Sequence, residues 1–183
     1  MLEAYTQLLV RYQEQAGLEQ EAACCGQDHH PCCQSPFELH LIESMHLSQV
    51  VNRMLSHTQR QEAINRAFDL ARRIKELHHQ APGLATDALA AHFINEQLTC
   101  PLLEEGQCLV FSERPKRCRF WHHEEHDHAF DLEQSTIALS RQAFYELTGG
   151  SVPLGDLRFT SADTISGKFV QLYFQAMTGR DRE

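Results

Sequence analysis

The chain has 183 residues, of which 42% are hydrophobic and 22% charged, and its formal net charge is -9. This length and composition are typical of a soluble globular protein, and we predict one domain over residues 1–183. The acidic balance provides no basic face for duplex nucleic acid or for an anionic membrane, so neither is expected as a partner.

The N-terminal segment and the cysteine count both bear on the compartment. The first residues lack a basic stretch followed by a long apolar run, and no window approaches the roughly 18 apolar residues that span a bilayer. We therefore predict a cytoplasmic protein. Because thiols stay reduced there, clustered cysteines indicate metal binding or catalysis more than disulfides. The cysteine count of seven is odd, which also argues against complete pairing.

Hydrophobic residues recur at helical spacing along most of the chain, which predicts a mainly α fold with little or no β structure. A first helix is predicted over residues 2–20 and a second over 36–57, with Ser35 as its N-cap and proline at its first position. The remaining predicted helices cover residues 58–79, 86–97, 131–148 and 161–178. Residues 152–159 are predicted to be loop, and Gly106 to form a turn before a short extended piece.

The seven cysteines fall into two clusters in the punctuated segments between helices. The upstream set is Cys24, Cys25, Cys32 and Cys33, and the downstream set is Cys100, Cys108 and Cys118. Thiolates bind zinc and iron–sulfur clusters strongly, and loops let sulfur atoms converge. We therefore predict that the cysteine-rich loops gather into one metal site that holds zinc or iron, the iron either as an ion or as an iron–sulfur cluster. The alternative for a single cysteine, Cys24 above all, is a small buried core residue.

The downstream cluster also carries a family resemblance. Cys100-Pro-Leu-Leu, then Cys108-Leu-Val-Phe, then Arg114-Pro-Lys-Arg-Cys118-Arg follow the order of the motifs C-P-x-L, C-x-I/V-Y/F and R-P-x-x-C-R. In this respect the chain resembles the YkgJ-type family of small bacterial cysteine-cluster proteins, described as zinc- or iron-chelating domains.

The family's upstream motif, C-x-x-C-G-x-C-C, is matched in its second half. Cys25-Gly26 and Cys32-Cys33 correspond to it, with Gln-Asp-His-His-Pro in place of one residue. The first family cysteine falls on Ala22, and Cys24 is either its replacement or a bystander. The resemblance implies a bound metal and leaves the reaction undefined. A related motif that accompanies flagellin lysine methylases points toward protein modification.

Histidines and arginines near the cysteines are further candidates. His29 and His30 lie within the upstream loop and are alternatives to a missing cysteine ligand. The tract from His122 to His128 contains imidazoles and carboxylates, and it is either a mixed-ligand or second metal site or an exposed polar run. Arg114 is expected to shape the turn before Cys118. Arg117 or Arg119 either neutralises thiolate charge or lies in solvent.

The motif His40-x-x-Glu43-x-x-His46 has the spacing of one helix face, as in di-iron bundles. Such sites need a second pair and more glutamates, and the sequence shows no convincing partner. We therefore interpret this motif as surface.

Three functions are compatible with the sequence. The first is a metal-binding protein with a thiolate site that is structural if it holds zinc and redox-active or sensory if it holds a cluster. The second is a metal-dependent enzyme, or an accessory to protein modification, in which an open metal position activates water or substrate. The third is a protein-interaction module that the metal makes rigid.

Overall fold

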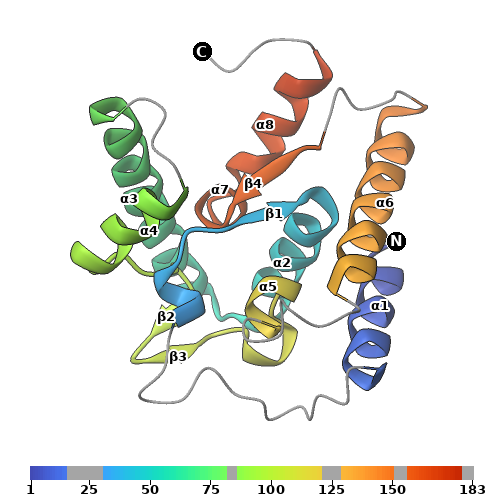
Figure 1. The fold of residues 1–183 in the computed structure, drawn as a ribbon, viewed down its shortest axis with the longest axis horizontal. Coiled ribbons are helices and arrows are strands. Elements are labelled where there is room, and N and C mark those ends of the chain that lie inside the picture. The colour runs from blue at the N-terminus through green and yellow to red at the C-terminus, as the bar shows by residue number, and fades with distance from the viewer. Residues whose placement is uncertain (16–30, 82–85, 121–128, 151–155, 179–183) are drawn as a thin grey trace.

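The computed structural model describes residues 1–15, 31–81, 86–120, 129–150 and 156–178. In these ranges the chain is mainly helical, with two small antiparallel sheets, each of two strands (Figure 1). This confirms the prediction of a mainly α protein with little β structure. No helix in the described ranges is both long and apolar enough to cross a bilayer.

Six helices of ten residues or more form most of the structure. They are α1 (Leu2–Gln15), α2 (Leu41–Met54), α3 (His57–Gln80), α4 (Thr86–Asn95), α6 (Ala129–Thr148) and α8 (Lys168–Met177). The short helical elements are η1 (Pro31–Gln34), η2 (Phe111–Glu113), α5 (Lys116–Arg119) and α7 (Ser161–Ile165). The strands are β1 (Glu38–His40), β2 (Leu103–Glu104), β3 (Gln107–Cys108) and β4 (Arg158–Thr160).

The start of the second predicted helix is wrong. The helix does not begin at Pro36, because residues 38–40 form strand β1 and α2 begins only at Leu41. Strand β1 pairs antiparallel with β4, and the opposed residues Leu39 and Phe159 are both almost completely buried. Burial of this long-range pair outweighs the local helix signal of a serine followed by a proline.

The C-terminal segment differs from its predicted loop and single helix. Residues 151–155 lie outside the described ranges, but the next residues form β4 and the N-cap of α7 is Thr160 rather than Ser161. The Thr160 hydroxyl accepts a hydrogen bond of 3.0 Å from the backbone N–H of Asp163. Gly167 then adopts a φ of 79° and divides the predicted helix into α7 and α8.

Other predictions hold within one or two residues. Helix α3 begins after the N-cap Ser56 rather than near Thr58, and α4 and α6 match their predicted ranges. Strands β2 and β3 form a hairpin whose turn contains Gly106 at a φ of 78°. The predicted turn and short extended piece are therefore present.

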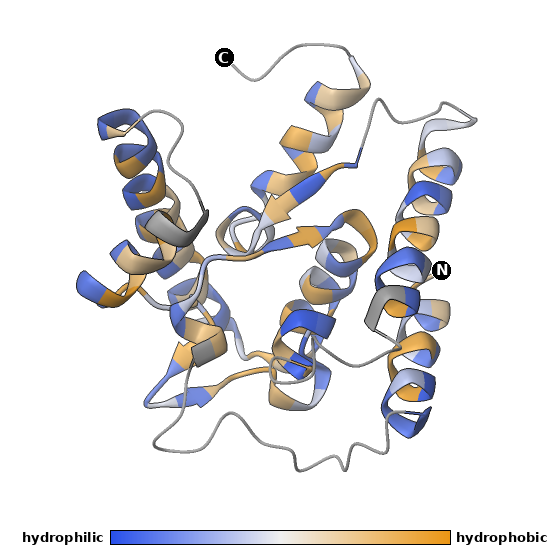
Figure 2. Ribbon diagram, in the orientation of Figure 1, coloured by the Kyte–Doolittle hydropathy of each residue, from blue (hydrophilic) through white to orange (hydrophobic). Residues whose placement is uncertain are grey.

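The core has two main parts, which follow from the amphipathic helices. Each long helix carries apolar and polar stretches in alternation (Figure 2). One part combines α2 and α3 residues such as Leu47 and Ala67 with the cysteine-bearing segments. The other is aromatic, joins α1, α6 and α8, and includes the edge-to-face pair of Phe144 and Tyr173 at 5.3 Å.

Candidate functional site

The structure places five of the seven predicted cysteine ligands. Cys32 and Cys33 lie in η1, Cys100 follows α4, Cys108 lies on β3 and Cys118 lies in α5. None of these five forms a disulfide. Cys24 and Cys25 lie outside the described residues, so their predicted role as ligands stays a prediction.

Backbone contacts bring the upstream and downstream segments together. The N–H of Cys100 donates a hydrogen bond of 2.7 Å to the carbonyl oxygen of Cys33. Cys108 pairs with Leu103 in the hairpin that follows Cys100. All five described cysteines belong to, or pack against, the same part of the core, in which Cys32, Cys33 and Cys118 are buried.

The thiols interact across the two segments in two pairs. A hydrogen bond from the Cys33 thiol outweighs burial and lowers the pKa of Cys100. A hydrogen bond with the Cys32 thiol, together with burial, raises the pKa of Cys118 well above its ordinary value. Within the upstream pair, the sulfur atoms of Cys32 and Cys33 are 3.9 Å apart. Each described upstream thiol therefore has a downstream partner.

These thiols are neighbours without forming a complete metal site. Among the residues that the structure describes, no three or more His, Cys, Asp or Glu side chains form a group that could hold a metal ion. The described arrangement is thus a cluster of thiols, of which Cys32, Cys33 and Cys118 are buried and Cys100 and Cys108 are partly buried.

The arginines around the thiols divide into different roles. Arg114 is buried, its guanidinium lies 4.0 Å from the centre of the Phe111 ring, and its Nε donates to the Phe111 carbonyl oxygen. It therefore shapes the turn before Cys118, as predicted. Arg119 donates to the Ser112 carbonyl oxygen at 2.6 Å.

An arginine far upstream in the sequence also acts on the thiols. The positive charge of Arg66, on α3, contributes to the lowered pKa of Cys100. Its Nε donates a hydrogen bond of 2.9 Å to the carbonyl oxygen of Pro101. No pattern in the sequence indicates this role, because Arg66 is one of several arginines on an otherwise ordinary amphipathic helix.

The motif of His40, Glu43 and His46 is not at the surface, contrary to prediction. All three residues are 3% exposed or less, because the β1–β4 pair and α6 cover the start of α2. Glu43 accepts hydrogen bonds of 3.1 Å from the Tyr5 hydroxyl and from the backbone N–H of His40. Burial and the Glu43 charge raise the pKa of Tyr5 well above its ordinary value.

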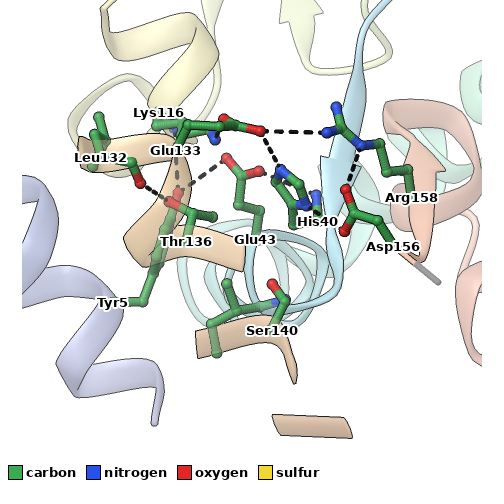
Figure 3. A network of polar contacts seen from close by, with 11 residues as sticks. Tyr5, His40, Glu43, Lys116, Leu132, Glu133, Thr136, Ser140, Asp156 and Arg158 are labelled. Atoms are coloured by element: carbon green, nitrogen blue, oxygen red, sulfur yellow. Dashed lines mark hydrogen bonds and ion pairs between the residues drawn. The ribbon is translucent and has the colours of Figure 1, made fainter. Parts of the chain in front are cut away.

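His40 is the centre of a polar network that joins β1, α5, α6 and β4 (Figure 3). Its Nε2 lies 2.7 Å from Oε1 of Glu133 on α6, and its Nδ1 lies 3.0 Å from Oδ1 of Asp156 just before β4. Lys116 also bonds to Glu133, and Arg158 bonds to Asp156 at 3.0 Å. Because a carboxylate lies against each ring nitrogen, His40 presents neither nitrogen to a metal ion or a substrate. The network therefore connects β1 to α6 and to the segment before β4, and its role is structural.

The acid at the centre of this network is strongly perturbed. Burial disfavours the ionised form of Glu133, but hydrogen bonds from Lys116 and His40 outweigh it and lower its pKa to about 2. The network therefore stabilises the ionised carboxylate at any moderate pH. Sequence reasoning missed Glu133 and Asp156, because they are separated from His40 by most of the chain.

His46 differs from His40 in lacking hydrogen-bond partners. Within the described part of the chain, neither of its buried ring nitrogens has one, and Nε2 is 3.9 Å from a carboxylate oxygen of Glu113. Its ring packs edge-on against Tyr5, with 5.3 Å between ring centres. Burial lowers the pKa of His46. The neutral imidazole is therefore the favoured form.

The other histidine candidates, His29, His30 and the tract over residues 122–128, lie outside the described residues. Comparison of the chain with protein-family models, curated proteins and solved structures gives no match. The resemblance to the YkgJ-type family therefore stays a prediction that depends on the cysteine motifs.

Proposed function

We propose that this chain is a metal-binding protein that holds zinc or iron through cysteine thiolates. The observation that supports the proposal best is the crossed pairing of thiols, Cys33 with Cys100 and Cys32 with Cys118. Five thiols from four separate elements or loops belong to, or pack against, one part of the core. Core cysteines that serve only as small apolar residues have no reason to converge in this way.

The sulfur spacing fits a shared ion. In a tetrahedral zinc site with Zn–S bonds of about 2.3 Å, two sulfur atoms are about 3.8 Å apart. The sulfurs of Cys32 and Cys33 are 3.9 Å apart. Because no described group of three ligands is complete, the proposed site requires the remaining thiols to move toward the ion. Sites that form only as metal binds behave in this way.

Proton release would accompany binding. Thiols bind metals as thiolates, so each ligand that is protonated beforehand gives up its proton to solvent. Because the pKa of Cys118 is raised, this thiol gives up its proton less readily than an ordinary cysteine. In contrast, the hydrogen bond from the Cys33 thiol, helped by the positive charge of Arg66, lowers the pKa of Cys100. The downstream cluster thus contains one thiol that loses its proton more easily than usual and one that loses it less easily.

The direct test is anaerobic purification followed by metal and sulfide analysis and a visible spectrum. Iron with sulfide and a brown colour indicates an iron–sulfur cluster, whereas a colourless protein with zinc indicates a thiolate zinc site. We expect the Cys33→Ser and Cys118→Ser variants to lose most of the metal. Wild-type protein that contains no metal under these conditions would contradict the proposal.

A matched control separates the thiols from the histidine tract. A variant with alanine at His122, His123, His126 and His128 removes the alternative imidazole ligands. It should retain the metal content of the wild type if the thiols bind the ion. Loss of metal in this variant, with the cysteine variants still loaded, would assign the ion to the tract.

A further inference from the structure

Two thiols of the cysteine cluster are held together through both their side chains and their main chains. The Cys33 thiol donates a hydrogen bond to the sulfur of Cys100. The backbone N–H of Cys100 in turn donates a bond of 2.7 Å to the carbonyl oxygen of Cys33. Neither residue forms a disulfide in the structure. They are therefore a reduced pair that joins η1 to the segment after α4.

The backbone bond sets how far apart the two residues can be. Only the N–Cα, Cα–C and C=O bonds lie between the hydrogen-bonded atoms and the two Cα atoms, so the Cα atoms are within about 7 Å of each other. Cysteines whose Cα atoms are more than about 7 Å apart cannot be bridged without movement of the backbone. With the two sulfur atoms already in contact, Cys33 and Cys100 meet the requirement for a disulfide.

The other thiol contacts are less suited to this bond. Cys32 and Cys33 have sulfur atoms 3.9 Å apart, but consecutive Cα atoms across a trans peptide are only about 3.8 Å apart, below the usual range for a disulfide. Cys32 and Cys118 share a hydrogen bond, but they are 1% and 8% exposed. Cys100 is only partly buried. An oxidant from solvent therefore reaches the pair of Cys33 and Cys100 first.

We propose that Cys33 and Cys100 form a reversible disulfide driven by hydrogen peroxide. The peroxide oxidises the Cys100 thiol to a sulfenic acid and is itself reduced to water. The Cys33 sulfur then attacks the sulfenic sulfur, the S–S bond forms, and the sulfenic hydroxyl leaves as a second water with the Cys33 proton. Two thiols and one peroxide thus give one disulfide and two waters. Exchange with a dithiol such as dithiothreitol restores both thiols.

This disulfide regulates the metal site, a consequence that rests on the proposed function. Metal ions bind thiolates, and the sulfur atoms of a disulfide no longer carry that charge. The bond removes one ligand from the upstream segment and one from the downstream segment, whereas a structural zinc site takes four ligands. The site should therefore release its ion on oxidation and bind it again on reduction.

The test uses the full chain, purified anaerobically and then treated with a small molar excess of hydrogen peroxide. Digestion with trypsin and a glutamate-specific protease separates Cys100 from Cys108 at Glu104 and Glu105. Tandem mass spectrometry then identifies the linked cysteines. We expect the disulfide between Cys33 and Cys100 to be the main cross-link between the two segments, and to be absent after treatment with dithiothreitol.

The same samples report the ion. A chromogenic chelator measures the metal released as the disulfide accumulates. We expect release in proportion to the disulfide, and binding of the metal again after reduction by dithiothreitol. Direct damage of an iron–sulfur cluster by peroxide gives a different result, because dithiothreitol alone does not rebuild a cluster.

Three variants locate the reaction. Cys33→Ser and Cys100→Ser each remove one sulfur, and each should lower the yield of the peroxide-induced cross-link between the two segments at least about tenfold. Cys108→Ser is the matched control, because Cys108 is also a partly buried thiol of the downstream cluster. It should form the disulfide between Cys33 and Cys100 to the same extent as the wild type. Circular dichroism shows whether each variant retains the fold.

The outcomes are distinguishable. A wild-type protein in which another cysteine pair forms the main cross-link, or in which Cys100 is oxidised only to sulfinic or sulfonic acid, overturns the proposal. Disulfide formation while the ion stays bound also overturns it. Formation of the disulfide in protein that contains no metal as purified supports the redox pair and contradicts the proposed metal site instead.

Discussion

The backbone N–H of Cys100 donates a hydrogen bond of 2.7 Å to the carbonyl oxygen of Cys33. This bond joins the two cysteine clusters at main-chain level, so their convergence does not depend on the thiol groups themselves. Substitution of a thiol by a hydroxyl should therefore leave the two segments together. The effect of a Cys→Ser change can be read as an effect on the site rather than on the fold.

Removal of the metal is the first prediction. If an ion is bound at about 1,000 times its dissociation constant, chelation should lower the free energy of unfolding by about 4 kcal/mol. Thermal unfolding with and without a strong chelator measures the change. The Cys33→Ser variant, which is expected to lack the ion, should show no further loss on chelation. An unchanged wild-type melting temperature would count against a bound metal.

Replacement of His40 tests the polar network. His40→Leu removes both contacts to Glu133 and Asp156 and should destabilise the protein by about 2 kcal/mol. Urea unfolding gives this value. His57→Leu is the control, because His57 is exposed at the start of α3 and its change should stay within about 0.5 kcal/mol. Equal effects of the two changes would mean that the network adds little stability.

The pKa of Glu133 predicts an acid-dependent loss of stability. Its pKa is about 2 in the folded protein, against an ordinary value of 4.5. The stabilisation is complete above pH 4.5 and is lost as the pH falls toward 2. Because the side chain is 35% exposed, we discount the contribution to about 1 kcal/mol. The free energy of unfolding, measured between pH 2 and 4.5, should change less with pH for Glu133→Gln than for the wild type.

His46 predicts a second pH dependence, in a different range. Because burial lowers its pKa below the ordinary 6.5, the unfolded chain binds the proton more readily. Stability should therefore be complete above pH 6.5 and decline as the pH falls below it. The nearby charges, Glu113, Arg53 and Arg119, are unaltered by His46→Phe.

His46→Phe should remove this decline and cost less than about 1 kcal/mol at pH 8, because it also removes two buried ring nitrogens without partners. Unfolding at a series of pH values provides the measurement. The exposed His79→Phe is the control and should retain the wild-type slope. A His46→Phe protein with an unchanged slope would show that another group titrates there.

Gly167 tests the junction of α7 and α8. Its φ of 79° is in the left-handed region, and a Cβ atom at this position would meet nothing within 4 Å. The cost of Gly167→Ala is therefore backbone strain alone, about 1 kcal/mol. Gly167→Asn should cost less, because asparagine tolerates this conformation better. Thermal unfolding of both variants distinguishes strain from crowding, which would make asparagine the worse substitution.

The elements that the sequence predicted well depend on local signals. The spacing of apolar residues located α3 and α6, and Gly106 marked the β2–β3 turn. The cysteine clusters were visible because thiols are rare and chemically distinctive. In contrast, β1 and β4 are strands of three residues whose hydrogen-bonding partner is the other strand, far away in the sequence. A local sequence pattern does not predict such a pair.

The polar residues around α2 were misjudged for a related reason. A His-x-x-Glu-x-x-His pattern on one helix face does not reveal whether that face is covered. Here the partners Glu133 and Asp156 follow His40 at separations of 93 and 116 residues. The surface interpretation followed from the absence of a convincing partner motif in the sequence, and the tertiary pairing with Glu133 and Asp156 contradicts it.

The register of β1 on β4, with Glu38 opposite Thr160, also constrains how the protein folds as it is synthesised. Leu39 and His40 acquire their partners only after Phe159 and Asp156 have left the ribosome. Chains that end before β4 would expose this apolar edge and leave the start of α2 uncovered, in a state prone to association. Strand β1 and the start of α2 therefore depend on the synthesis of β4 for their final closure.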